Sequence, residues 1–221
     1  MPRAATASPD KILAAAALEF SERGYAGARV DRIARRARVN KALLYYHFGS
    51  KQSLYRTLLR QTFAGAVALL QPIVASGASP DEQIRQMVVV FGRFILERQF
   101  FPAIMLREIA DGGVHLDRET LAVLAGLPLS VATVVRKGVA AGQLRDVHPV
   151  AAYFTIVAPI VMYLAGASLR STLTKTRLAD MSSLSPDVFI EQLQESVRLA
   201  FAARPEPGRE APRRSSRRSR Q

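Results

Sequence analysis

The chain has 221 residues, of which 49% are hydrophobic, so it is long enough for one medium domain with a buried core and one small domain. Cysteine is absent, which excludes thiol catalysis, thiolate metal sites and disulfides, and suits a reducing, cytoplasmic location. The formal net charge of +13 is uneven, because residues 1–60 carry +8, residues 204–221 carry +5 and residues 61–203 are neutral. Localised basicity indicates a polyanionic partner, with nucleic acid as the first candidate and an anionic membrane as the rival.

Helical periodicity begins at Asp10, after residues 1–9, which are expected to form a flexible N-terminal arm. An apolar stripe from Ile12 to Phe20 predicts a first helix that ends at Gly24, since glycine readily takes the left-handed conformation past a helix end. The alternative for Ile12–Leu18 is a signal peptide. It lacks a small-residue cleavage site and charged residues follow at once, so an amphipathic helix is favoured.

Two short helices are predicted next. One covers about Val30–Ala37, and Asn40 offers a side-chain cap for the other, Lys41–Phe48. Three short helices in the first fifty residues, the last two joined by a brief turn, are typical of a helix-turn-helix. Residues 10–55 are therefore predicted to be a DNA-binding domain.

The helix Lys41–Phe48 has two different faces when it is projected at 100° per residue. Leu44 and Phe48 fall on the side that would pack under the other helices, whereas Tyr46 falls on the outer side. Outward aromatic side chains suit a DNA groove, where tyrosine hydroxyls can donate to phosphates. The alternative is that the tyrosines complete a core, and Tyr45, at the flank, is the better candidate for packing.

The remainder is predicted to be helical without strands or repeats, giving an all-α chain. Ser50 caps a helix from Lys51 to about Leu70, and the loop 76–80 separates it from the next helix. Further helices are expected at Asp81–Arg98, at Pro102–Ala110 before Gly112-Gly113, at Asp117–Ala141 with an interruption near Gly126 and Pro128, at Val150–Leu169, and at Pro186–Ala203.

The uncharged segment Val150–Leu169 is long enough to cross a bilayer, and a membrane span is one interpretation of it. Pro159 and several small residues favour a buried dimerisation helix instead, so no membrane partner is expected. Residues 204–221 carry seven arginines and no apolar anchor, and are expected to be a disordered basic tail. The tail is either a solvated extension or a polycation that adds sequence-independent DNA affinity.

Several strings between Lys11 and Leu58 carry a family resemblance: residues 12–16, 20–25, 33–37, Val39, Lys41, the run Leu44-Tyr45-Tyr46-His47-Phe48, Ser50-Lys51 and Leu54. On these residues the chain resembles the TetR family of regulators. The resemblance implies an N-terminal three-helix helix-turn-helix DNA-binding domain and a larger helical C-terminal dimerisation and ligand-binding domain, here residues 56–203.

The resemblance also implies residue roles. It puts Lys41 and Ala42 near base edges, Tyr45, Tyr46 and His47 toward phosphates, and Lys51 on a phosphate at a helix N-terminus. Three positions depart from the family pattern: Arg29 replaces the usual Thr or Ser, Arg38 replaces the turn glycine, and Leu43 replaces a small or hydroxylated residue. The predicted DNA-binding residues are Arg29, Asn40, Lys41, Ala42, Leu43, Tyr45, Tyr46, His47 and Lys51.

By the same resemblance, Val150–Leu169 and Pro186–Ala203 would form a homodimer interface, and middle helices would hold an effector. The predicted ligand-binding residues are Phe94, Glu97, Phe101, Met105, Glu108, Met162 and Tyr163. The competing interpretation is that these aromatic and methionine residues are simply core. The bulk of the set predicts a hydrophobic or aromatic small molecule.

The predicted function is a sequence-specific regulator that binds double-stranded operator DNA, a repressor released by a small hydrophobic or aromatic effector. A ligand-independent dimeric regulator or activator is the alternative. An enzyme is not expected, because no catalytic Ser-His-Asp pattern, phosphate loop or metal-ligand spacing stands out, and no cofactor or metal is predicted.

Overall fold

The computed structural model describes residues 9–203. Within that range the chain is helical, without strands apart from one isolated bridge between Leu144 and Ala202. This confirms the all-α prediction. The helices are α1 (Pro9–Gly27), α2 (Val30–Ala37), α3 (Lys41–Phe48), α4 (Lys51–Ala75), α5 (Pro80–Leu96), α6 (Phe101–Ala110), α7 (Arg118–Ala140), α8 (Pro149–Ala165), α9 (Ala167–Lys175) and α10 (Pro186–Phe201).

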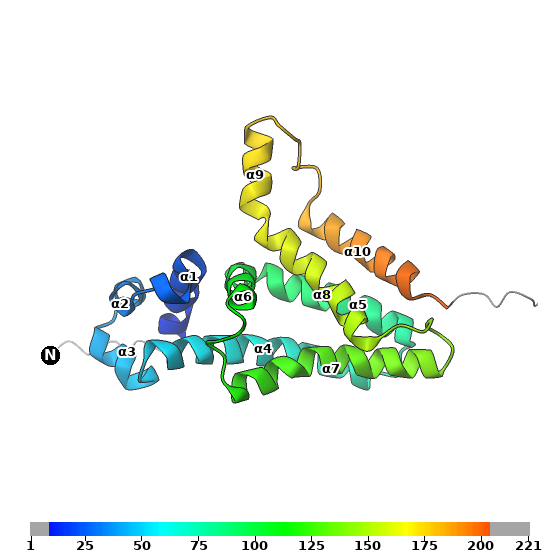
Figure 1. The fold of residues 1–221 in the computed structure, drawn as a ribbon, viewed down its shortest axis with the longest axis horizontal. Coiled ribbons are helices and arrows are strands. Elements are labelled where there is room, and N and C mark those ends of the chain that lie inside the picture. Colours follow the sequence, from blue (N-terminus) through cyan, green and yellow to red (C-terminus); the bar gives the residue numbers. More distant parts are fainter. Residues whose placement is uncertain (1–8, 204–221) are drawn as a thin grey trace, which may run out of the picture.

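The helices form a small head and a larger body joined by α4 (Figure 1). The head consists of α1, α2, α3 and the start of α4, whereas α5 to α8 and α10 form the body. Helix α4 packs along α7, and α5 packs against both α8 and α10. Because one buried cluster runs from Ile12 in the head to Phe201 in the body, the two parts share a continuous core.

Helices α3 and α4 start at the side-chain caps that the sequence predicts. The Asn40 side chain accepts from the Leu43 N–H at 2.7 Å, and Ser50 Oγ accepts from the Ser53 N–H at 3.0 Å. These caps satisfy amide groups that the first turn of a helix leaves without partners. They fix the start of α3 and the start of α4.

Helix α4 is longer than predicted, and α7 lacks the interruption that was predicted for it. Helix α4 continues through Pro72 to Ala75, and α7 runs unbroken through Gly126 and Pro128. The two helices bury each other, and a Cβ at Gly126 would lie 2.9 Å from Val67 Cγ2. The glycine therefore permits close packing between the helices rather than a kink, and the packing offsets the cost of the prolines.

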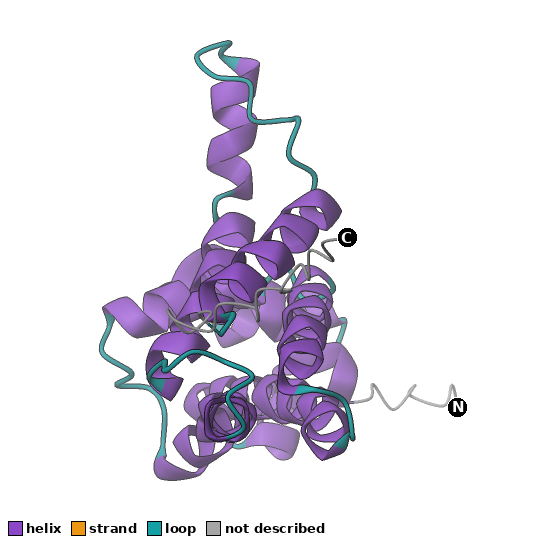
Figure 2. Cartoon of the chain, turned by 90° about the vertical axis from the view of Figure 1, so that its right-hand side faces the viewer, coloured by secondary structure: helices purple, strands orange, loops and turns teal. Residues whose placement is uncertain are grey.

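The predicted helix Val150–Leu169 is wrong at its C-terminal end. Helix α8 stops at Ala165, and the chain bends by 48° at Gly166 into α9, which the periodicity did not reveal because its sequence is polar. Viewed from the side, α9 stands away from the body (Figure 2).

Length and composition alone would let more segments cross a membrane than the one considered from sequence. Helices α4 and α7 each pass such a test, as does the bent pair α8 and α9. In this fold, α4 and α7 pack against each other and against α5, and α7 also packs against α8.

The first helix begins one residue before the predicted start. Pro9, assigned to a flexible arm, is the first residue of α1. The rest of that arm, residues 1–8, and the predicted basic tail, residues 204–221, lie outside the described residues. The predicted domain boundary between residues 55 and 56 falls inside the continuous helix α4.

Candidate functional site

The turn between α2 and α3 depends on a left-handed arginine. Arg38 has φ 57° and ψ 43°, and its N–H is directed at the carbonyls of Ala34 and Arg35. A glycine would take this conformation without a steric cost, so the turn is strained at Arg38. The side chain of Arg38 remains exposed beside α3.

Helix α3 presents the outer face that the projection predicts. Leu44 is fully buried and Phe48 packs against the core, whereas Tyr46 is 83% exposed and Tyr45 is 41% exposed. Tyr45 is thus the better packed of the two tyrosines, as expected. The exposed side chains of α3 also include Lys41, Ala42 and His47, and Leu43 is half-buried.

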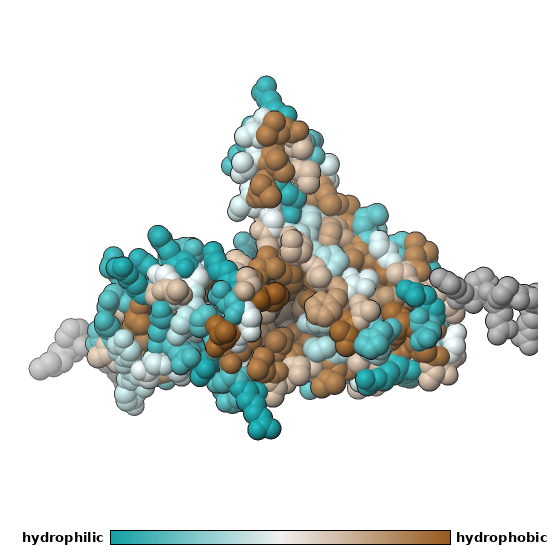
Figure 3. Space-filling view, viewed as in Figure 1, coloured by the Kyte–Doolittle hydropathy of each residue, from teal (hydrophilic) through white to brown (hydrophobic). Residues whose placement is uncertain are grey.

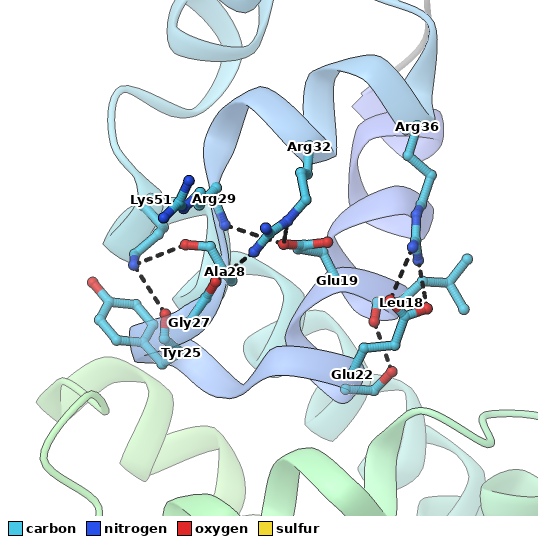
Figure 4. Close-up of polar contacts among 11 residues, drawn as sticks. Leu18, Glu19, Glu22, Tyr25, Gly27, Ala28, Arg29, Arg32, Arg36 and Lys51 are labelled. Carbon is cyan, nitrogen blue, oxygen red and sulfur yellow. Dashed lines mark hydrogen bonds and ion pairs between the residues drawn. The ribbon is translucent and has the colours of Figure 1, made fainter.

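A buried carboxylate joins α1 to α2, and sequence reasoning missed it. Glu19 is 1% exposed, and its Oε1 accepts from Arg32 Nε at 2.6 Å and from the Arg29 N–H at 3.2 Å (Figure 4). Arg32 also donates to the Gly27 carbonyl. The signal available in the sequence was a single acidic residue next to Phe20 on an apolar helix face. Charge-assisted hydrogen bonds of this kind fix the angle between the helices.

Lys51 points inward in the unbound head. Its Nζ donates to the carbonyls of Tyr25 at 2.9 Å and Ala28 at 3.2 Å, and lies 4.5 Å from the centre of the Tyr25 ring (Figure 4). Lys51 therefore holds the turn between α1 and α2, a role that the resemblance does not imply. One ammonium hydrogen is left for another acceptor.

Lys41, at the start of α3, forms an exposed ion pair with Asp31 at 2.9 Å. This pairing raises the pKa of Lys41 and lowers the pKa of Asp31, chiefly through their hydrogen bond. Solvent screens the pair, so Lys41 can exchange Asp31 for another acceptor at small cost.

Basic side chains without ion pairs flank α3. Within the described part of the chain, Arg29, Arg35 and Arg38 are exposed and form no ion pair, whereas Arg36 is held by both carboxylate oxygens of Glu22 at 2.9 Å. They lie on α2 and at its two ends, and Arg29 and Arg35 are close enough to help lower the pKa of Asp31, the partner of Lys41 at the start of α3. The arrangement matches the electrostatic requirement for contact with a phosphate backbone.

The body contains an apolar cavity of about 170 Å³. The space-filling view shows a hollow bordered by hydrophobic residues in the middle of the molecule (Figure 3). The cavity is lined by Phe63, Phe91, Phe101, Met105, Leu106, Ile109, Leu124, Leu127, Tyr153, Phe154, Val157, Ala158, Val161 and Met162. The only polar side-chain atom among them is the Tyr153 hydroxyl, which makes no hydrogen bond within residues 9–203, and burial raises its pKa.

Three of the seven predicted ligand residues line this cavity, namely Phe101, Met105 and Met162. The structure does not bring the other four there. Phe94 is buried beside Gly65, and Glu97 is exposed and pairs with Arg98. Tyr163 stacks on Phe189, and Glu108 faces the head. Spacing alone could not show which side of each helix faces the cavity.

Helix α6 connects the cavity to the head. Arg107 donates to the carbonyls of Phe20 and Ser21, in the turn of α1 before the kink at Gly24. Gly24, with φ 68°, makes room for this contact, since a Cβ there would lie 3.3 Å from Arg107 Cδ. The next residue, Glu108, also points toward the head, whereas Met105 and Ile109 line the cavity.

Glu108 is the centre of a buried polar cluster. It is 2% exposed, accepts from the Tyr55 hydroxyl at 2.8 Å and the His115 N–H at 3.0 Å, and lies 3.1 Å from His115 Nδ1. Burial and the Glu108 carboxylate raise the pKa of Tyr55. The His115 ring lies 4.1 Å from that of Tyr25, so the cluster reaches the same turn that Lys51 holds.

Two comparisons with known proteins match the head alone. Residues 12–58 match the family model described as bacterial regulatory proteins, tetR family. The HTH-type transcriptional repressor SCO4008 of Streptomyces coelicolor is 46% identical over 55 residues, which is 25% of this chain and 29% of the relative. That similarity is confined to less than a third of the relative.

Two other comparisons extend over the body. The HTH-type transcriptional repressor NicS of Pseudomonas putida is 28% identical over 174 residues, 77% of this chain and 82% of the relative. The crystal structure of the TetR family transcriptional regulator PfmR from Thermus thermophilus is similar with a TM-score of 0.67 and 22% identity. That likeness covers 85% of this chain and 97% of the other.

Proposed function

We propose, from the premise that this chain belongs to the TetR family of bacterial regulatory proteins, that it is a homodimeric repressor released from operator DNA by a small apolar effector. That the chain is a DNA-binding transcriptional regulator and not an enzyme follows from the family. Repression is supported by the function of the relatives NicS and SCO4008. The observation that carries the DNA contact is the exposed face of α3, bordered by unpaired arginines.

The DNA contact assigns different tasks to different side chains. Helix α3 would enter the major groove, with Lys41 and Ala42 at base edges and Tyr46 and His47 toward the phosphates. Arg29 and Arg38 would add phosphate contacts that fix orientation without reading sequence. Leu43, half-buried at the inner edge of this face, would have at most an apolar contact with a thymine methyl.

The volume and the lining of the cavity determine the size and charge of the effector that it could bind. A dry cavity of about 150 Å³ can bind benzene, so about 170 Å³ suits a molecule of one ring or a short chain. No charged side chain lines it, and an ion would lose its hydration without a partner. The effector would therefore be neutral and largely apolar, with one group that hydrogen-bonds to the Tyr153 hydroxyl.

Release would follow from the two faces of α6. An effector touching Met105 and Ile109 would shift the helix whose neighbouring residues, Arg107 and Glu108, hold the head. A ligand changes affinity at a second site only if it favours one arrangement of the connecting element. Helix α6 touches both sites, as does α4, whose Phe63 also lines the cavity.

The test begins with selection of operator fragments from random DNA by the full-length chain. Neutral aromatic and aliphatic molecules are then titrated into the complex, with matched carboxylates as controls. We expect a neutral ligand to weaken operator binding about tenfold or more, within the usual range of allosteric coupling. Selection of no sequence would contradict the regulator, whereas operator binding insensitive to every ligand would favour the ligand-independent alternative.

A further inference from the structure

The positive charge that follows α10 in the sequence is concentrated in a short run. Residues 204–212 contain two arginines, two glutamates and three prolines and have no net charge, whereas residues 213–220 contain five arginines, three serines and no acidic residue. We refer to residues 213–220 as the basic run and to residues 204–212 as the spacer. The proposed function gives the charge of the basic run no task.

The place where the chain leaves the body is fixed by contacts with the connection between α7 and α8. The Arg145 N–H donates to the Phe201 carbonyl at 3.0 Å, and the Arg145 guanidinium donates to the carbonyl of Ala200. Leu144 forms the isolated bridge with Ala202. These contacts hold the last turn of α10 against the body, so the spacer starts from a defined position.

That position lies at the end of α4 that is remote from α3. Leu144 packs on Gly138 near the end of α7, where an added Cβ would lie 2.5 Å from Leu144 Cδ1 and 2.8 Å from Pro80 Cβ. Pro80 begins α5, and Gln83 on α5 donates to the Ile73 carbonyl in the last turn of α4 at 2.7 Å. The other end of α4 follows α3, about 38 Å away along a helix of 25 residues. The end of α10 and helix α3 accordingly lie at opposite ends of the molecule (Figure 1).

The spacer is too short to bring the start of the basic run to the DNA-facing end of its own chain. Arg213 follows Ala203 by ten residues, which span at most about 33–36 Å when fully extended. Helix α4 alone is longer than that. Arg217 and the arginines after it would pass the start of α4 only if the chain ran nearly straight along the body. Most of the charge of the basic run is therefore available at the far end of the molecule, away from the operator.

Carboxylates beside this position are too few to neutralise five arginines. The α7–α8 connection, residues 141–148, has a single carboxylate, Asp146. Glu195, the acidic residue of α10 closest in sequence to its end, is already held by Arg198 at 2.7 Å. The basic run therefore requires an anionic partner from another molecule.

The composition of the basic run indicates the phosphate backbone of a nucleic acid. Arginine binds phosphate through two parallel N–H donors, and serine hydroxyls also donate to phosphate oxygens. The run has no apolar side chain to insert into a bilayer and no aromatic side chain on which a single-stranded base would stack. Double-stranded DNA is favoured, since α3 would already bring the chain to DNA.

We propose that the basic run binds the phosphates of a second DNA duplex at the end of the body opposite α3, so that the regulator bridges its operator to another DNA segment. The bridging rests on the proposed function, because α3 supplies the operator contact. Contacts with phosphates carry no sequence information, so the second segment needs no particular sequence. In the homodimer each chain would contribute one basic run, and the two would act together on one duplex.

The test measures capture of a second duplex. An immobilised operator fragment is loaded with the full-length chain, and retention of a fluorescent random-sequence duplex is measured. The test variant keeps the length of the basic run but removes its charge, and combines Arg213→Gln, Arg214→Gln, Arg217→Gln, Arg218→Gln and Arg220→Gln. The matched control keeps the charge and combines Ser215→Ala, Ser216→Ala and Ser219→Ala.

We expect the glutamine variant to retain at least about tenfold less second duplex than the parent and the control, because the counterion release of its phosphate contacts is lost. For five lost contacts, the slope of log affinity against log salt for the second duplex should fall in magnitude by about 4–5. Operator affinity should be unchanged among the three proteins.

Equal capture by the parent and the glutamine variant would overturn the inference. So would an operator affinity that falls with the five arginines while no second duplex is captured, because the run would then contact DNA beside the operator. Stronger displacement of the duplex by phosphatidylserine vesicles or single-stranded RNA, at equal phosphate concentration, would assign the run to that partner instead. A bead-bound chain that selects no operator but retains random duplex through its arginines would contradict the proposed function and leave the DNA contact of the basic run standing.

Discussion

Charged side chains organise the head before it meets any DNA. Glu19 fixes α2 against α1, Lys51 holds the turn between them, and Arg38 makes the turn before α3. Lys41 differs from these, because its ion pair with Asp31 is exposed and readily exchanged. Basic residues that look equivalent in the sequence therefore fall into two groups, one that holds the head together and one of exposed side chains that we propose contact DNA.

Replacing Lys51 by methionine should test the structural group. The variant keeps the apolar stem but leaves the Tyr25 and Ala28 carbonyls without their charged donor, and we expect a loss of about 1–3 kcal/mol in the free energy of unfolding. Urea denaturation measures it. Lys41→Met is the control, expected to leave stability unchanged while weakening preference at one base pair roughly tenfold. The opposite result would be unchanged stability of Lys51→Met together with a DNA affinity whose salt dependence falls by about one phosphate contact. It would mean that Lys51 contacts DNA and does not stabilise the head.

Arg38 carries a backbone cost that glycine would remove. A left-handed conformation costs a non-glycine residue about 1–2 kcal/mol, part of which the greater unfolded-state freedom of glycine offsets. We therefore expect Arg38→Gly to raise thermal stability, and Arg35→Gly, inside α2, to lower it by about 1 kcal/mol. Both variants lose one exposed cation, so equal shifts in calorimetric melting temperature would show that the turn is unstrained.

At the scale of elements, α6 stands between two sites. Its residues alternate between the cavity and the head, so a rotation of the helix moves both sets together. Arg107 donates hydrogen bonds to carbonyls of α1, and Glu108 accepts hydrogen bonds from Tyr55 and His115.

Arg107→Met should therefore uncouple the sites without abolishing either. The variant keeps the side-chain stem near Gly24 but donates nothing to the Phe20 and Ser21 carbonyls. We expect operator affinity and effector binding to change little, and the factor by which an effector weakens DNA binding to fall severalfold. Fluorescence anisotropy with and without effector measures that factor. Arg93→Met, an exposed arginine on α5, is the control and should keep full coupling.

Sequence patterns predicted elements best where local chemistry decides them. Asn40 and Ser50 cap helices within one turn, and α2 and α3 match prediction residue for residue, whereas Gly24 kinks α1 rather than ending it. Long-range contacts explain what was missed. The continuity of α7 through Pro128 depends on packing against α4, and the burial of Glu19 depends on an arginine thirteen residues away. Of the predicted ligand residues, those on the inner face of α6 and at the rim on α8 reach the cavity, whereas Glu97 and Glu108 face elsewhere.

At the scale of the whole molecule, a single α3 of eight residues reads too few bases to define an operator. A two-fold dimer would present two such helices about 34–36 Å apart, or one turn of DNA. We expect footprinting to reveal a near-palindromic site with half-sites at that spacing. Sedimentation should show a dimer at micromolar concentration. A protected site without inverted symmetry would contradict this arrangement.

The continuity of α4 has a consequence for modularity. The helix has 25 residues, extends for about 38 Å, and belongs to the head at one end and the body at the other. The two parts therefore have no linker that absorbs a change in length. One residue inserted after Leu59 would turn the head by about 100° about the helix axis and advance it by about 1.5 Å. A hybrid regulator that joins this head to another body must keep the helical phase of α4 to the residue, and evolution by domain exchange is constrained in the same way.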